Sequence, residues 1–219
     1  MKKVISFSLW GNDEKYTIGA LKNADLALKI YPDWVCRYYI GKSTDNSIIN
    51  ALKKKKNVEV IEMDESGDWD GMFWRFYTID DPEVTVSLSR DTDSRLSIRE
   101  KLAVDQWMES DKGFHIMRDH PYHNIEILGG MWGIKKNIIN DFRLLCDDFR
   151  KGNYYQVDQH FLREIIYPIV KDNCMVHDEF FNINKNSLNF PSKRENKGFV
   201  GEVYDELDRR NPSHYNLIP

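Results

Sequence analysis

The stretch Val84-Thr85-Val86-Ser87-Leu88-Ser89-Arg90-Asp91-Thr92-Asp93 decides the fold, because it joins a short apolar segment directly to two aspartates. The apolar and β-branched side chains of residues 84–88 predict a buried strand. Ligands of open α/β sheets bind at the carboxyl ends of the strands. Alternate side chains of an extended segment project to one side, so Asp91 and Asp93 can meet one cation there.

The chain before this stretch alternates between two periodicities. Residues 4–9, 34–40 and 58–63 have strand patterns, and residues 14–30 and 46–55 have apolar side chains at helical spacing. Such β-α-β-α-β alternation predicts a parallel sheet flanked by helices. We expect Ser43 or Thr44 to cap the second helix. After the first three strands we expect a helix at 72–79, the strand at 84–88, and a helix through residue 108 that Ser97 caps. A strand at 114–117 and a glycine-broken strand at 126–134 follow. The last predicted elements are helices at 138–150 and 158–170, the second ended by Pro168, and a strand at 175–177.

Composition narrows the class of protein. The 219 residues are 41% hydrophobic and carry a formal net charge of -4, which fits one globular domain and excludes the strongly basic footprint of a general nucleic-acid binder. No apolar run approaches the length of a membrane span, and the first residues do not form a secretory signal pattern. Cys36, Cys146 and Cys174 are few and far apart, which predicts reduced thiols in a cytoplasmic protein.

The domain organisation follows from a change in composition near residue 182. Residues 1–181 carry the strand and helix patterns, whereas residues 182–219 are mostly polar and charged. We therefore expect one catalytic domain and a C-terminal arm that packs on it, not a second domain.

The two aspartates predict a metal site. A divalent cation held by one or two carboxylates and by substrate phosphates is the usual Mg²⁺ arrangement, and an imidazole ligand would shift the preference toward Mn²⁺. A second Asp-x-Asp triplet at residues 68–70 lacks the preceding apolar strand. The alternative interpretation of Asp91 and Asp93 is an Asp-rich turn tied to Arg90 and Arg95.

Together these features resemble a known fold family. The N-terminal β-α-β-α-β unit, the strand ending in Asp91-Thr92-Asp93, and Leu128-Gly129-Gly130-Met131-Trp132-Gly133 are similar to GT-A glycosyltransferases, which use nucleotide sugars. More narrowly, residues 74–76, 90–95, 99–101, 117–121 and 129–130 resemble small single-domain transferases of surface-polysaccharide synthesis. The resemblance covers roughly residues 3–181. It implies an α/β, GT-A (Rossmann-like) fold with a mixed, mostly parallel sheet flanked by helices.

The resemblance also implies donor-binding residues. The first strand and its loop would hold the nucleotide base, and the metal on Asp91 and Asp93 would hold the diphosphate. A late His often completes such a metal site, and His177 is the match, although a His packed against a strand end is nearly as good an interpretation. Lys193 and Arg194 could fold onto the diphosphate or belong to a solvated tail. The predicted nucleotide- and donor-binding residues are Ser8, Trp10, Asn12, Arg75, Arg90, Thr92, Arg99, Lys193 and Arg194.

The reacting sugar needs a polar group beside its anomeric carbon, because cleavage there creates an oxocarbenium-like centre. Asp158 is our candidate, since Asp158-Gln159 is similar to an Asp-Gln segment near the donor sugar in several GT-A families. The alternative is that Asp158 is a helix N-cap. For the acceptor and transferred sugar we expect contacts from His120, Gly130, Trp132 and Gln159.

The sequence therefore predicts a metal-dependent glycosyltransferase that moves a sugar from a nucleoside diphosphate donor, with UDP favoured, to a glycan acceptor using Mn²⁺ or Mg²⁺. One alternative is a metal-dependent phosphohydrolase that uses Asp91 as nucleophile or ligand. Another is a sugar-binding module of the same fold without catalysis.

Overall fold

The computed structural model describes residues 1–149 and 152–219 and contains a seven-stranded sheet in the order β3-β2-β1-β4-β6-β5-β7. Every neighbouring pair is parallel except β4–β6 and β5–β6, so β6 alone runs against the others. The strands are β1 (Lys2–Leu9), β2 (Val35–Ile40), β3 (Val58–Glu62), β4 (Val84–Ser89), β5 (Phe114–Arg118), β6 (Trp132–Lys135) and β7 (Cys174–Asp178). The prediction of a mixed, mostly parallel sheet is confirmed.

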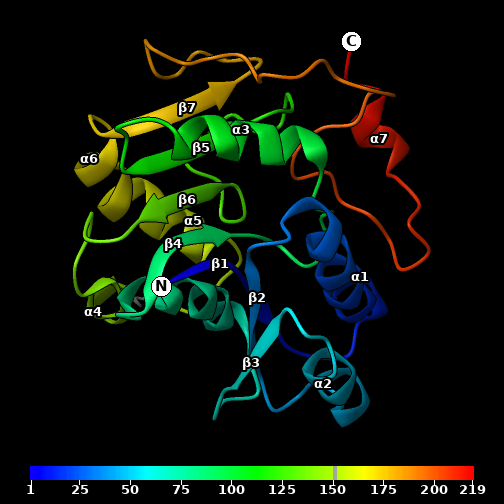
Figure 1. The fold of residues 1–219 in the computed structure, drawn as a ribbon. Coiled ribbons are helices and arrows are strands. Elements are labelled where there is room, and N and C mark those ends of the chain that lie inside the picture. The colour runs from blue at the N-terminus through cyan, green and yellow to red at the C-terminus, as the bar shows by residue number, and fades with distance from the viewer. Residues whose placement is uncertain (150–151) are drawn as a thin grey trace.

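Helices cover both faces of the sheet (Figure 1). One hydrophobic cluster joins β1, β2 and β4 to α1 (Glu14–Ile30), α2 (Asn46–Lys53) and α3 (Ile98–Met108). A second cluster joins β5, β6 and β7 to the 3₁₀ helix η1 (Trp69–Asp80) and to α4 (Phe142–Phe149) and the helical segment after it. The segment from residue 157 to 170 consists of α5 (Val157–Phe161), the π-helical η2 (Leu162–Ile166) and α6 (Tyr167–Val170). The strands of the sheet therefore pack against helices through two separate hydrophobic clusters.

The aromatic helix predicted at 72–79 is present as a 3₁₀ helix over residues 69–80. Other local predictions differ from the structure. Pro168 does not end its helix, because it lies in the first turn of α6, directly after the π-helical η2, and proline is tolerated in a first turn. The capping prediction for α2 fails because Asp45 occupies the N-cap position, while the Ser43 hydroxyl accepts a hydrogen bond from the Gly11 N–H at 2.8 Å. The glycines at 129 and 130 lie in a loop before β6, not within the strand.

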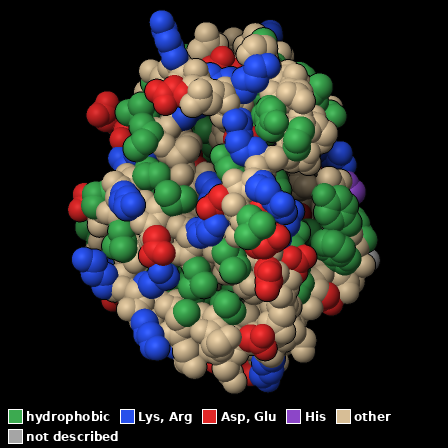
Figure 2. All heavy atoms as spheres, turned by 90° about the vertical axis from the view of Figure 1, so that its right-hand side faces the viewer, with side chains coloured by type: hydrophobic (Ala, Val, Ile, Leu, Met, Phe, Trp, Pro, Cys, Tyr) green, Lys and Arg blue, Asp and Glu red, His purple; other side chains and the backbone are tan. Residues whose placement is uncertain are grey.

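The C-terminal arm, residues 182–219, runs along the β7 edge of the sheet and then beside α1 (orange to red in Figure 1). Val203 bridges to Ser94, and the Tyr204 N–H donates to the Asp93 carbonyl at 2.9 Å. Lys22 of α1 contacts Asp208 of the arm at 2.5 Å. Figure 2 shows this face of the molecule, on which basic and acidic side chains are interspersed rather than gathered by sign. The arm includes the short helix α7 (Pro212–Tyr215).

Two further findings concern membrane-spanning helices and the three cysteines. Across residues 1–149 and 152–219, no helix combines the length and the apolar character needed to cross a membrane. No disulfide joins Cys36, Cys146 or Cys174, and burial raises the pKa of Cys36 to about 12.

Candidate functional site

A cleft of about 540 Å³ opens where β1 and β4 end. Its walls come from segments that are distant in sequence: the loop after β1, the start of α1, η1, the loop after β4, the loop before β6, the segment around α5, and the C-terminal arm. Its position at the carboxyl ends of parallel strands is where open α/β sheets bind their ligands. The predicted site residues that line it are Ser8, Trp10, Asn12, Arg75, Asp91, Thr92, Asp93, Gly130, Asp158 and Gln159.

Arg75 joins two of the predicted carboxylates. Its guanidinium donates to Asp91 and, at 2.7 Å, to Oδ2 of Asp158. The side chains of Arg75 and Asp158 are 5% and 2% exposed, whereas Asp91 is 46% exposed to the cleft. Burial lowers the pKa of Arg75, but Asp91 and Asp158 more than compensate and raise it, so the cation is retained. Burial raises the pKa of Asp158 in spite of Arg75.

The second aspartate of the triplet also has a cationic partner. Lys15, in the first turn of α1, contacts Oδ2 of Asp93 at 2.7 Å. Burial and then the charge of Asp91 raise the pKa of Asp93, and Lys15 opposes them. The two carboxylates therefore lie close enough to repel one another, which is the situation that a bound cation relieves.

Two glycines allow this array to form. A Cβ on Gly130 would lie 2.1 Å from Oδ2 of Asp91, and one on Gly129 would lie 2.5 Å from Oδ2 of Asp158 and 2.6 Å from the Arg75 guanidinium. No side chain can occupy these positions while Asp91, Arg75 and Asp158 keep their places. The Gly-Gly pair in the sequence is thus explained by close approach of functional groups to the backbone.

The loop after β1 forms the other end of the cleft. Oδ1 of Asn12 accepts a hydrogen bond from the Asp45 N–H at 2.7 Å, which ties the loop to the start of α2. Trp10 packs over Gly67 and meets Trp74 edge-on at a ring-centroid distance of 6.1 Å. The Ser8 hydroxyl accepts from the Arg75 N–H at 3.0 Å and connects this end to the carboxylate array.

The structure does not bring His177, the predicted third metal ligand, to Asp91 and Asp93. His177 is fully buried, and its ring nitrogens contact His115 at 2.8 Å and Gln106 at 3.0 Å. It lies on β7, which β6 and β5 separate from β4 in the sheet. Burial lowers its pKa to about 4. Among the described residues, no cluster of three or more His, Cys, Asp or Glu side chains could hold a metal, so any cation would rely on Asp91, Asp93 and its other ligand atoms from substrate or water.

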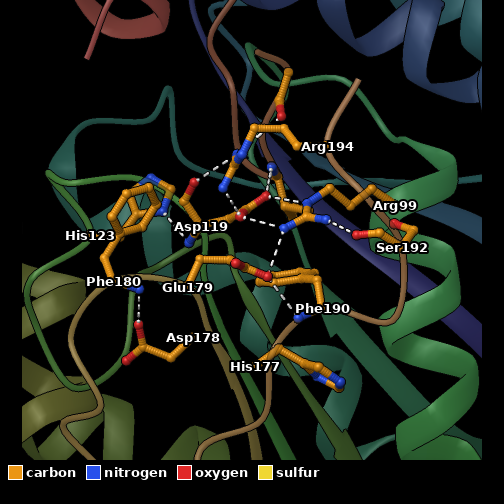
Figure 3. A network of polar contacts seen from close by, with 12 residues as sticks. Arg99, Asp119, His123, His177, Asp178, Glu179, Phe180, Phe190, Ser192 and Arg194 are labelled. Carbon is orange, nitrogen blue, oxygen red and sulfur yellow. Dashed lines mark hydrogen bonds and ion pairs between the residues drawn. The ribbon is translucent and has the colours of Figure 1, made fainter. Parts of the chain in front are cut away.

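Arg99 and Arg194 do not reach the cleft either, because both bind the buried carboxylate of Asp119 (Figure 3). Arg99 donates to Asp119 at 2.8 and 3.0 Å and Arg194 at 2.7 Å, and the Val200 N–H donates to the same carboxylate at 2.8 Å. These contacts fasten the C-terminal arm to the end of β5. Lys193 lines a separate depression beside Arg99 and Arg194.

The remaining predicted residues outside the cleft are structural. Trp132 is 1% exposed, stacks on Phe114 at 5.2 Å, and donates from its indole N–H to the Gly129 carbonyl at 3.0 Å. Arg90 is buried and donates to Glu100 at 2.8 Å and to the Trp132 carbonyl at 2.9 Å. Trp132 and Arg90 thus hold the glycine loop and β4 from beneath.

His120 packs on the C-terminal arm rather than in the cleft. Its ring lies 4.4 Å from that of Phe199, and its Nε2 contacts the His214 carbonyl at 3.0 Å. The nearby His123 does line the cleft, and burial lowers its pKa to about 3. The N-cap interpretation of Asp158 is also wrong, because Gln156 occupies that position.

The sequence did not single out Lys15, the ion-pair partner of Asp93, although its place in the first turn of the helix after the first strand was a usable signal. Gly201 and Val203 gave none, because only the path of the C-terminal arm brings them to the cleft. Trp69 and Tyr155 also line it.

No family model matches the chain, and no curated protein matches it. Solved structures do match. A glycosyltransferase involved in glycosylation of the major capsid of PBCV-1 has a TM-score of 0.55 at 15% identity, covering 81% of this chain and 82% of that one. The mannosyltransferase PcManGT from Pyrobaculum calidifontis, in complex with GDP-Man and Mn²⁺, has a TM-score of 0.52 at 11% identity, covering 81% of this chain and 54% of that one.

The same fold occurs in enzymes of a different reaction. A putative glucose-1-phosphate thymidylyltransferase from Bacillus anthracis has a TM-score of 0.52 at 10% identity, covering 82% of this chain and 87% of that one. At these identities the likeness establishes the fold. The chain has the GT-A, Rossmann-like fold of nucleotide-sugar transferases, as its sequence predicts.

Proposed function

We propose that this protein is a glycosyltransferase that moves a sugar from a nucleoside diphosphate donor, with UDP favoured, to a glycan acceptor. The observation that carries the proposal is the array of Asp91, Arg75 and Asp158 at the base of the cleft, with Gly129 and Gly130 leaving room for it. The array combines groups that can bind a diphosphate with a buried carboxylate beside the space for a sugar. The fold shared with known glycosyltransferases supports the same conclusion.

The donor would lie across the cleft in a fixed direction. The nucleoside would contact the loop after β1, where Ser8, Trp10 and Asn12 line the cleft. The diphosphate would lie over Asp91 and Asp93, and the sugar over Asp158 and Gln159. This order follows from the positions of the residues along the cleft edge, since β1 and β4 are adjacent in the sheet.

Mn²⁺ or Mg²⁺ would fit the donor set, because the neighbouring carboxylates of Asp91 and Asp93 both line the cleft, and carboxylate oxygens together with substrate phosphates are usual ligands of these ions. Asp91 and Asp93 would hold the ion, which when bound supplies positive charge to the departing diphosphate. An imidazole ligand from His177 would favour Mn²⁺ over Mg²⁺, but His177 does not lie beside Asp91 and Asp93.

The chain's own residues supply the rest of the chemistry. Transfer breaks the bond between the anomeric carbon and the diphosphate oxygen, and the nucleoside diphosphate leaves with the electron pair. A bond then forms from that carbon to an acceptor hydroxyl oxygen, whose proton is released to solvent. Arg75 is a fixed cation beside the leaving group, and its buried position strengthens its interaction with developing negative charge. The carboxylate of Asp158, oriented by Arg75, would stabilise the positive charge on the sugar.

The test is calorimetry with UDP, with and without Mn²⁺, followed by measurement of UDP release from UDP-glucose and UDP-galactose. We expect metal-dependent UDP binding that is lost in Asp91→Asn and Asp93→Asn, and UDP release that stops on chelation. Binding without any UDP release under acceptor screening would favour the sugar-binding module. Release of inorganic phosphate from phosphomonoesters, without nucleotide binding, would favour the phosphohydrolase.

A nucleotidyltransferase is the second candidate, because the thymidylyltransferase structure is matched over 87% of its length. Incubation with a nucleoside triphosphate and glucose 1-phosphate separates the two reactions. Pyrophosphate release would indicate the nucleotidyltransferase, whereas UDP release from a UDP-sugar would indicate the glycosyltransferase.

A further inference from the structure

Two exposed aromatic rings stand together at the edge of the cleft. Trp69 of η1 and Tyr155, just before α5, are 42% and 65% exposed, and both line the cleft. Their ring centroids are 5.3 Å apart and their planes meet at 71°. One ring can therefore offer its face to a ligand while the other offers its edge.

The pair is held in place by polar contacts that have no part in the proposed transfer of the sugar. The Asn153 side chain accepts a hydrogen bond from the Trp69 N–H at 3.1 Å and donates to Oδ2 of Asp68 at 2.7 Å. Oδ1 of Asp68 in turn accepts from the Asp70 N–H at 2.9 Å and caps η1. Asn153 thus joins two segments that are 84 residues apart in the sequence. The two backbone segments that carry the aromatic rings are therefore tied together.

The backbone beside the pair is also constrained. Gln156 adopts a left-handed conformation, with φ of 68° and ψ of 18°, which residues other than glycine rarely adopt. This conformation turns the chain between Tyr155, at the edge of the cleft, and Asp158, at its base. Such strain concentrates at ligand sites, where the surrounding structure enforces it.

We propose that Trp69 and Tyr155 form a subsite for a sugar ring of the acceptor, an inference that rests on the proposed function. A pyranose presents a face of C–H groups, which suits the negatively polarised face of an aromatic ring, and its hydroxyls suit the polar groups beside it. Those groups are Gln156 and Gln159, which line the same part of the cleft. Tyr155 lies three residues before Asp158, on the side of the transferred sugar, whereas Trp10 and Asn12 already serve the nucleoside end.

The test compares Trp69→Ala and Tyr155→Ala with Tyr122→Ala. Tyr122 is a matched control, because it is 61% exposed and lies outside the cleft. Saturation-transfer NMR with maltose, cellobiose and lactose at millimolar concentration detects sugar binding without any donor. We expect at least one of these sugars to bind the wild-type protein, and its signal to vanish in both cleft variants and persist in the control.

Kinetics give the second readout. With an acceptor found by screening, each cleft variant should raise the acceptor KM by about 10-fold, as expected for a lost aromatic contact of about 1.4 kcal/mol. UDP affinity and hydrolysis of the UDP-sugar by water should stay near wild type, and Trp69→Phe should recover part of the affinity for the acceptor.

A loss of UDP affinity in Trp69→Ala would overturn the proposal and assign the pair to the nucleobase. Unchanged sugar binding and acceptor KM in both variants would also overturn it. If the wild-type protein neither binds UDP nor cleaves UDP-sugars, the proposed function fails, and the sugar-binding experiment still decides the role of the pair.

Discussion

Alanine at each of the two glycines before β6 should separate donor binding from sugar transfer. In Gly130→Ala the new Cβ lies 2.1 Å from Oδ2 of Asp91, so that carboxylate must retreat by about 1 Å, a displacement that can cost about 10²-fold in rate. Because Asp91 is 46% exposed, it can turn toward solvent, and we expect a loss of only about 1 kcal/mol in the free energy of unfolding. Metal-dependent UDP affinity should fall together with transfer.

Gly129→Ala should behave differently. Its Cβ meets Asp158 at 2.5 Å and the Arg75 guanidinium at 2.6 Å, and neither group has room to move, since their side chains are 2% and 5% exposed. Separating a buried ion pair costs about 3 kcal/mol or more, so this variant should be the less stable of the two. Transfer should fall by about 10²-fold, whereas UDP affinity should fall less than in Gly130→Ala, because the new Cβ displaces Arg75 but does not meet Asp91.

The assays are urea denaturation, calorimetry with UDP and Mn²⁺, and UDP release in the presence of acceptor. Gly152→Ala is the control, because its Cβ would come no closer than 3.4 Å to the Tyr154 ring, an ordinary contact. The reasoning is refuted if Gly130→Ala retains both UDP affinity and transfer, since Asp91 would then have no role that depends on its position.

Three other predictions concern single groups. Asp158→Asn should lower transfer by about 10² or more with UDP affinity and melting temperature near wild type, and near-normal transfer would remove Asp158 from the catalytic machinery. Burial lowers the pKa of folded His177 to about 4 from the ordinary 6.5, so the neutral ring stabilises the fold above pH 6.5 and this contribution, about 3 kcal/mol, is lost as the pH falls toward 4. Because burial also lowers the pKa values of His115 and His123, His177→Gln should reduce the slope of that part of the urea-denaturation pH profile without abolishing it, and an unchanged profile would contradict the assignment. Asp119→Ala should destabilise the protein by about 3–5 kcal/mol and expose residues 182–219 to limited proteolysis, because Arg99 and Arg194 lose their buried partner, whereas an arm that stays resistant would show that other contacts hold it.

Arg99 and Arg194, predicted to bind the donor, instead hold the C-terminal arm in place, a role that the sequence did not suggest. Arg99 and Arg194 have the charge expected of diphosphate ligands, yet both bind Asp119 (Figure 3). Neither lines the cleft that Asp91 and Asp93 line. By fastening the arm, they keep Gly201 and Val203 at the wall of the cleft. The two arginines therefore contribute to the site by positioning the part of the arm that lines the cleft.

The sequence by itself determined the sheet-forming pattern and the location of the cleft. Strand and helix periodicities are local properties, and they gave the alternation of elements through β4 with boundaries within a few residues. The position of Asp91 and Asp93 directly after an apolar strand is also local, and it places both at the carboxyl edge of the sheet. The close spacing of Gly129 and Gly130 likewise indicated an approach to the backbone before the approaching groups were known.

Only the tertiary structure decided which groups meet across the chain. His177 ends a strand as predicted, but the strand order β4-β6-β5-β7 carries it away from Asp93, and no local pattern encodes that order. Lys15 reaches Asp93 only because α1 packs against the loop after β4, with Gly19 against the Thr92 carbonyl. Long-range pairing depends on how two apolar layers and one arm pack together, and residue type and spacing alone do not specify that packing.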